Sequence, residues 1–138
     1  MTRVAPPLYL DTSAVLRAAL ESGTTPEIDE RISTAPLLIT SRLSLVEASR
    51  ALLRVRSTGS VPEVRIADVT RDITQLWLRC EIWELSRSVC ELAAQVAPFT
   101  RLRTVDALHL ATFLLARETI ADLELLTADE RLREAAGS

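Results

Sequence analysis

The chain has 138 residues, of which 48% are hydrophobic and 25% are charged, so it is long enough to form one domain with a sizeable core. All 16 basic residues are arginines and only three glycines occur, which excludes a lysine-dependent phosphate loop and a glycine-rich dinucleotide loop. The net charge of −3 argues against binding nucleic acid by bulk attraction, so any such binding needs a local arginine patch and bound cations.

The first part of the chain alternates short apolar runs with helical patterns. A strand is predicted over Pro7–Leu10, and a helix over Ser13–Ser22 that Gly23 stops. A second helix is predicted over Pro26–Ile32, because proline suits an early helical position. The apolar run Leu37–Thr40 is predicted to form the second strand.

Two longer amphipathic segments follow. The first predicts a helix over Ser44–Arg56. The second predicts a helix over Glu63–Leu76, in which Val64, Ala67 and Ile73 are expected to face the core.

The last third of the chain continues the alternation. A strand is predicted over Cys80–Leu85 and a helix over Ser86–Ala97, before a proline. An apolar helix follows over Thr104–Ile120, then a strand over Leu123–Leu126 and a short helix that Asp129 opens. Strands that alternate with helices predict parallel βα units.

The cysteines and the hydropathy indicate in which cellular compartment the protein is expected. Cys80 and Cys90 match no metal motif by their spacing, and we expect both to be reduced core residues. No apolar run approaches the roughly 20 residues that span a membrane, and the N-terminus has no signal-peptide pattern. A cytoplasmic location, without membrane association, is therefore expected.

Four acidic residues in four separate places are the strongest functional signal. They are Asp11, Glu47, Asp106 and Asp129, each of which is predicted near a junction of strand and helix. In a parallel sheet the carboxyl ends of the strands share one edge, where ligands bind, so these acids are expected to meet. Because clustered carboxylates repel one another, we expect a hard divalent cation such as Mg²⁺ or Mn²⁺ among them.

Each acid also has a purely structural interpretation. Asp11, Asp106 and Asp129 are predicted near helix starts, where acids cap the helix or complement its dipole. Glu47 lies inside a helix, where an ion pair with Arg50 would contribute only about 0.2–0.5 kcal/mol. The joint occurrence of all four in matching contexts favours a common site.

The single histidine, His109, lies one turn after Asp106 on the same side of the predicted helix. Two interpretations are open. His109 either binds substrate or steadies a carboxylate, or it is a buried structural residue that donates to a backbone carbonyl, which is the interpretation that we favour.

Four segments together resemble the PIN-domain nucleases, and within them the VapC-type toxins of prokaryotic toxin–antitoxin modules. The segments are Y-L-D-T-S-A-V-L, S-L-V-E-A-S-R-A-L, V-D-A-L-H-L-A-T and L-L-T-A-D-E-R-L, in this order along the chain. The resemblance implies one PIN-like domain over residues 1–138, of the α/β class. Its three layers, α/β/α, would enclose a mostly parallel sheet of four or five short strands. The short last strand common in such proteins is expected to be shortened or absent.

The resemblance also implies an activity. The implied activity is that of an endoribonuclease that depends on one or two Mg²⁺ or Mn²⁺ ions and hydrolyses selected structured RNA such as tRNA or rRNA. Asp11 and Asp106 would be the main metal ligands, and Glu47 and Asp129 would complete the shell directly or through waters. The hydroxyls of Ser13 and Thr127 would orient a carboxylate or a water. Four rim arginines would attract RNA: Arg50, Arg54, Arg101 and Arg103.

Partners follow from the same resemblance. A VapB-like antitoxin would silence the enzyme, and a homodimer is implied. Candidate residues for the antitoxin groove have helical spacing, although we expect most of them to be core: Leu16, Leu20, Leu52 and Leu53.

Two rival functions belong to other classes. A catalytically silent PIN-like scaffold that binds a protein partner needs no acids, so the presence of all four argues against it. A serine hydrolase with Ser49 or Ser13 and His109 is disfavoured because the sequence has no G-x-S-x-G elbow.

Overall fold

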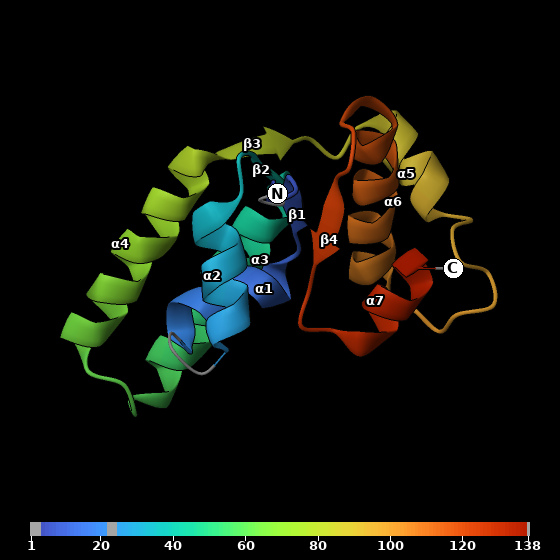
Figure 1. Ribbon diagram of the computed structural model, residues 1–138. Helices are drawn as coiled ribbons and strands as arrows, with labels where there is room; N and C mark the ends of the chain where they lie inside the picture. The colour runs from blue at the N-terminus through green and yellow to red at the C-terminus, as the bar shows by residue number, and fades with distance from the viewer. Residues whose placement is uncertain (1–3, 22–24, 138) are drawn as a thin grey trace.

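Four short parallel strands form the centre of the protein, in the order β3-β2-β1-β4 (Figure 1). The computed structural model describes residues 4–21 and 25–137, so the helix end predicted at Ser22 and Gly23 lies outside the described residues. Within those ranges the predicted strands are confirmed, with slightly different ends. The strands are β1 (Leu8–Leu10), β2 (Leu38–Ser41), β3 (Cys80–Trp83) and β4 (Glu124–Leu126).

Helices cover both faces of this sheet. On one face lie α1 (Thr12–Leu20), α2 (Pro26–Thr34), α3 (Arg42–Thr58) and α4 (Glu63–Arg79), and on the other lie α5 (Arg87–Ala93), α6 (Thr104–Thr119) and α7 (Glu130–Gly137) (Figure 1). This arrangement confirms the α/β/α layering. In the described part of the chain no strand follows the last helix, as expected.

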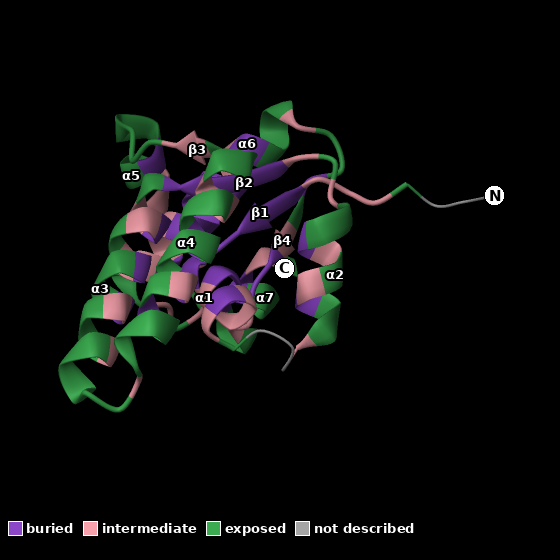
Figure 2. Cartoon of the chain, turned by 90° about the vertical axis from the view of Figure 1, so that its left-hand side faces the viewer, coloured by how far each residue is buried: buried purple, intermediate pink, exposed green. Residues whose placement is uncertain are grey.

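The strands divide the core in two because successive side chains point to opposite faces. Leu8 and Leu10 pack into a cluster with residues of α1, α2 and α4, whereas Tyr9 packs into a second cluster with residues of α6 and α7. Strands β1 and β2 are buried along their whole length between the two layers (Figure 2). A sheet that is covered on both faces leaves its edges and strand ends for function.

Helix α5 is shorter than predicted. It ends at Ala93 rather than at Ala97, because the backbone of Ala97 has a left-handed φ of 47° and Pro98 follows. A residue before proline is disfavoured in the helical region, so the helix unwinds before it. The segment 94–103 therefore leads in turns and bends to the start of α6.

Two expectations about buried side chains are wrong. Val64 and Ala67 are exposed, whereas Ile73 is buried as predicted together with Ile66 and Val69. The spacing of three and four residues places these isoleucines and Val69 on one helical face, and the helix is rotated away from Val64.

The second error concerns the cysteines. Cys80 is partly buried and Cys90, on α5, is exposed, so only Cys80 approaches the predicted core position. Burial raises the pKa of the Cys80 thiol to about 11, which keeps it protonated and unreactive at neutral pH.

The contrast between two positions of α4 gives a stability test. Ile73 is 4% exposed and Val64 is 71% exposed. We expect Ile73→Ala to lower the free energy of unfolding by about 2–5 kcal/mol, because it leaves a cavity in the core. Val64→Ala is expected to change it by less than about 0.5 kcal/mol. Urea unfolding measures both, and equal losses would contradict the packing of this helix.

Candidate active site

The four acids come from four separate places in the fold, and only Asp11 directly follows a strand. Asp11 follows β1, and Asp129 lies just beyond β4. Glu47 lies in the second turn of α3, and Asp106 lies in the first turn of α6, after the loop 94–103. The expectation of a strand–helix junction is therefore wrong for Asp106, whereas Glu47 lies in the helix that directly follows β2, and all four acids converge.

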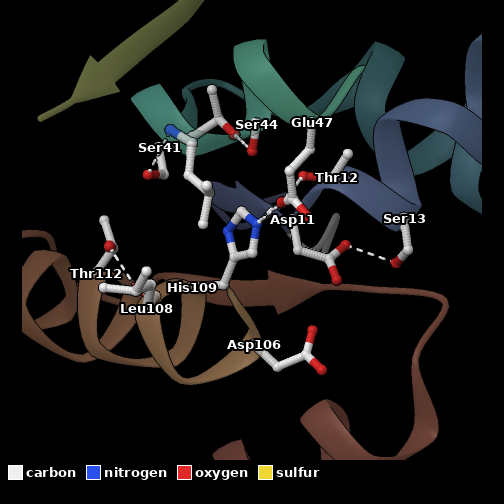
Figure 3. Close-up of polar contacts among 12 residues, drawn as sticks. Asp11, Thr12, Ser13, Ser41, Ser44, Glu47, Asp106, Leu108, His109 and Thr112 are labelled. Carbon is white, nitrogen blue, oxygen red and sulfur yellow. Dashed lines mark hydrogen bonds and ion pairs between the residues drawn. The ribbon is translucent and has the colours of Figure 1, made fainter. Parts of the chain in front are cut away.

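One cleft of about 210 Å³ receives all four acidic side chains. Figure 3 shows Asp11, Glu47 and Asp106 approaching it from separate elements. The lining residues are Asp11, Thr12, Ser13, Leu16, Glu47, Arg54, Arg103, Asp106, His109 and Asp129. Because four carboxylates share the cleft with two arginines, the cleft carries an excess of negative charge at neutral pH.

Asp11 is the most enclosed of the acids, with 3% of its surface exposed. Its Oδ1 accepts the backbone N–H of Ala14 (3.0 Å), which caps α1, and the hydroxyl of Ser13 (2.7 Å). Its Oδ2 accepts the hydroxyl of Thr127 (2.6 Å), from the residue after β4. The capping interpretation is thus confirmed, and Ser13 and Thr127 both orient this carboxylate.

The charge on Asp11 is nevertheless unfavourable. Burial raises the pKa of the Asp11 carboxyl above its usual value, and the bonds from Thr127, Ser13 and Ala14 oppose the rise without cancelling it. A buried anion whose own donors do not fully compensate it is a favourable position for a cation.

Glu47 is held by two donors on one oxygen. The hydroxyl of Thr12 donates to its Oε1 at 2.6 Å, and Nε2 of His109 lies 2.8 Å from the same atom. The surface ion pair considered with Arg50 is therefore not how this carboxylate is bound. Partial burial raises the pKa of Glu47, but the bonds from His109 and Thr12 outweigh it, so the pKa is lowered and the group stays ionised.

His109 is buried, with 2% of its surface exposed, and both ring nitrogens have partners. Nε2 faces Glu47, and Nδ1 lies 2.9 Å from the hydroxyl of Tyr9. The favoured expectation of a bond to a backbone carbonyl is wrong, and the alternative of a histidine that steadies a carboxylate is confirmed. Tyr9 is buried on β1, and burial raises the pKa of its hydroxyl, which therefore stays protonated.

Thr12 and Tyr9 are the site residues that sequence reasoning missed. Both flank the predicted acid of β1, Thr12 one residue after Asp11 and Tyr9 two residues before it. A polar hydroxyl inside a strand that is otherwise apolar was the available signal for Tyr9, because a buried phenol normally needs a hydrogen-bond partner.

Asp106 and Asp129 are the other two acids that line the cleft. Asp106 accepts from the guanidinium of Arg103 three residues earlier, with Nε at 3.0 Å from Oδ2. Its side chain is 11% exposed, whereas that of Arg103 is 73% exposed. Asp129 caps α7 by accepting the backbone N–H groups of Arg131 and Leu132.

The four rim arginines separate into two pairs. Arg54 and Arg103 line the cleft, whereas Arg50 and Arg101 are exposed outside it. Arg54 and Arg103 are therefore the cationic side chains nearest to a ligand in the cleft.

The donor chemistry of the cleft suits a hard divalent cation, because all four acids offer carboxylate oxygen. Across residues 4–21 and 25–137, no three acidic, histidine or cysteine side chains are already gathered in a metal-binding group. Each carboxylate is instead engaged by a donor of the protein, such as Thr127 for Asp11 or Arg103 for Asp106. Binding of a cation would therefore require the side chains of this all-oxygen donor set to rearrange.

Comparison with known proteins gives a consistent result. The sequence model of the PIN domain matches residues 8–138. Ribonuclease VapC46 of Mycobacterium tuberculosis is 31% identical over 94% of this chain and 89% of its own length, and Ribonuclease VapC35 of the same species is 35% identical over 94% and 89%. These are similarities over nearly the whole of each protein.

Solved structures show the same fold. M. tuberculosis VapC20, described as a sarcin–ricin loop cleaving toxin, superposes with a TM-score of 0.65 at 16% identity, over 93% of this chain and 94% of that one. A toxin–antitoxin complex from Klebsiella pneumoniae has a chain that superposes with a TM-score of 0.61 at 21% identity, over 88% and 86%.

Proposed function

Because this chain belongs to the PIN-domain family and has VapC ribonuclease toxins as homologues, we propose that it is a metal-dependent endoribonuclease of the VapC type. The observation that carries the proposal is the meeting of Asp11, Glu47, Asp106 and Asp129 in one cleft. The chain acts as a single domain in this proposal, and its substrate is a selected structured RNA such as tRNA or rRNA.

In this proposal the four acids together bind one or two Mg²⁺ or Mn²⁺ ions. Asp11 and Asp106 would be the main ligands, and Glu47 and Asp129 would complete the shell directly or through waters. Such an ion, when bound, would supply an activated water and neutralise phosphate charge. Burial of Asp11 supports its place at the centre, because its anionic form is the least well compensated by solvent.

Other residues of the chain orient the acids and the substrate. Ser13 and Thr127 fix the rotation of the Asp11 carboxylate from two sides. We expect Arg54 and Arg103, which line the cleft, to contact RNA phosphate, and Arg50 and Arg101 to extend a weaker basic rim. Because Arg103 already binds Asp106, approach of phosphate would exchange one anionic partner of this guanidinium for another.

Partners belong to the same proposal. We expect a VapB-like antitoxin to inhibit the enzyme and the chain to form a homodimer, in keeping with the fold shared with the K. pneumoniae toxin–antitoxin complex. Of the leucines considered for the groove, Leu53 is 50% exposed and Leu16 borders the cleft, whereas Leu20 and Leu52 pack against the core.

The location is part of the proposal as well. Among the described residues no helix has both the length and the apolar character to cross a membrane. We place the protein in the cytoplasm, where its RNA substrates are found.

Mapping of new 5′ ends in total RNA tests the function. We expect purified protein with Mn²⁺ to create new ends at one or a few sites, and a chelator to abolish them. The Asp11→Asn variant is the matched control for contaminating nucleases. Absence of new ends would contradict the proposal, and absence of Mn²⁺ binding as well would favour a silent protein-binding scaffold.

A further inference from the structure

A hydrogen-bonded row of side chains runs from two buried residues in the core to a half-buried glutamate in the cleft. Tyr9 on β1 is fully buried, and its hydroxyl contacts Nδ1 of His109, whose Nε2 contacts Oε1 of Glu47. Figure 3 shows the imidazole projecting from α6 toward the Glu47 side chain of α3. The row therefore joins three elements that are far apart in the sequence.

The partners determine the arrangement of protons in this row. An ionised carboxylate only accepts hydrogen bonds, so Nε2 of His109 carries the proton that faces Glu47. In the tautomer with the proton on Nε2, Nδ1 is an acceptor, and the hydroxyl of Tyr9, 2.9 Å away, can donate to it. Each group thus determines the orientation of the next, from the strand outward.

The row ends at Oε1 of Glu47. Both donors, Thr12 and His109, use Oε1, and no described residue donates to Oε2. The Glu47 side chain is 28% exposed and lines the cleft. Two donors on one oxygen fix the rotation of the carboxylate and leave the other oxygen for a ligand in the cleft.

We propose that Tyr9 and His109 are positioning residues that hold Glu47 with Oε2 available to the reaction centre. The inference rests on the proposed function, and it assigns a task to a histidine that is neither a metal ligand nor a base. A structural task alone does not require this chemistry, because an apolar side chain at position 109 would pack in the same core without the desolvation of two polar groups.

The tautomer of His109 tests the first link without any need for activity. His109 is the only histidine, so a long-range ¹H–¹⁵N spectrum of tag-free, histidine-labelled protein reports on this ring alone. We expect the proton on Nε2 and a bare Nδ1, and we expect the Nδ1 resonance to shift in Tyr9→Phe. A proton on Nδ1 with a bare Nε2 would overturn the proposal.

Single-turnover and steady-state kinetics test the second link. We expect His109→Leu to lower kcat about 10- to 100-fold and to weaken Mn²⁺ binding, with little change in KM for RNA. His109→Gln is expected to recover most of kcat, because its amide can donate from near the position of Nε2. Tyr9→Phe should lower kcat less than His109→Leu, and it should have no added effect in the His109→Gln background.

Ile73→Ala is the control for lost stability, because Ile73 is buried on α4 and does not line the cleft. If His109→Leu cleaves as fast as the parent, or if folded His109→Gln is as impaired as His109→Leu, the positioning role is wrong. A parent protein that binds Mn²⁺ but cleaves no RNA would contradict the proposed function instead, and the ring spectrum and Mn²⁺ affinities of these variants would still decide the positioning role.

Discussion

Asp11→Asn and, separately, Asp106→Asn are expected to reduce RNA cleavage by at least about 1,000-fold while the fold stays intact. Asparagine keeps the size of the side chain and, at position 11, an oxygen that can cap α1, but it removes the negative charge that holds a cation. A metal ion contributes several kcal/mol to phosphodiester hydrolysis, and each 1.36 kcal/mol is a tenfold change in rate. Single-turnover cleavage of the mapped RNA, with circular dichroism for the fold, measures the effect.

The matched control for this experiment is an acid far from the cleft. Glu91 lies on α5 in an exposed ion pair with Arg87, so Glu91→Gln removes the same charge from the surface. We expect it to cleave at the rate of the parent, because exposed ion pairs contribute about 0–1 kcal/mol to stability and the residue does not line the cleft. Retained cleavage in either aspartate variant, with normal metal dependence, would show that the acids are not the reaction centre.

Mn²⁺ is expected to raise the melting temperature of the parent and to leave that of Asp11→Asn nearly unchanged. A ligand that binds only the folded state stabilises it by about 2.7 kcal/mol at 100 times its Kd. For a chain of this length that corresponds to a shift on the order of 10 °C. Calorimetry with and without Mn²⁺ measures the shift, and it requires neither the RNA substrate nor the antitoxin.

Without metal, the stability of the parent relative to Asp11→Asn should depend on pH. Burial raises the pKa of Asp11 in the folded state, so the stability linked to its protonation is present at low pH and is lost as the pH rises through that raised pKa. Asp11→Asn has no such loss, so in the presence of chelator the parent should lose stability relative to Asp11→Asn from acidic to neutral pH. A parent that gains stability relative to Asp11→Asn over that range would contradict the assigned environment of Asp11.

Local patterns were sufficient for most elements of the fold. The buried strand before Asp11 and the helix around Glu47 are formed where their apolar spacing predicts them. The errors arose where the local signal was ambiguous. The helix predicted to reach Ala97 stops four residues earlier, and α4 turns Val64 outward, because burial of an amphipathic helix depends on what packs against it.

The sequence by itself determined which four acids were candidates for the site, their order and the carboxylate oxygens that they offer, because residue types and short-range spacing are local properties. Only the tertiary structure decided how they meet. In the fold, Thr127 is hydrogen-bonded to Asp11, 116 residues away in the sequence, and His109 to Thr12, 97 residues away. It also placed Arg54 and Arg103 inside the cleft and left the other rim arginines outside. Such contacts depend on how the sheet and both helical layers pack, and no local pattern encodes that packing.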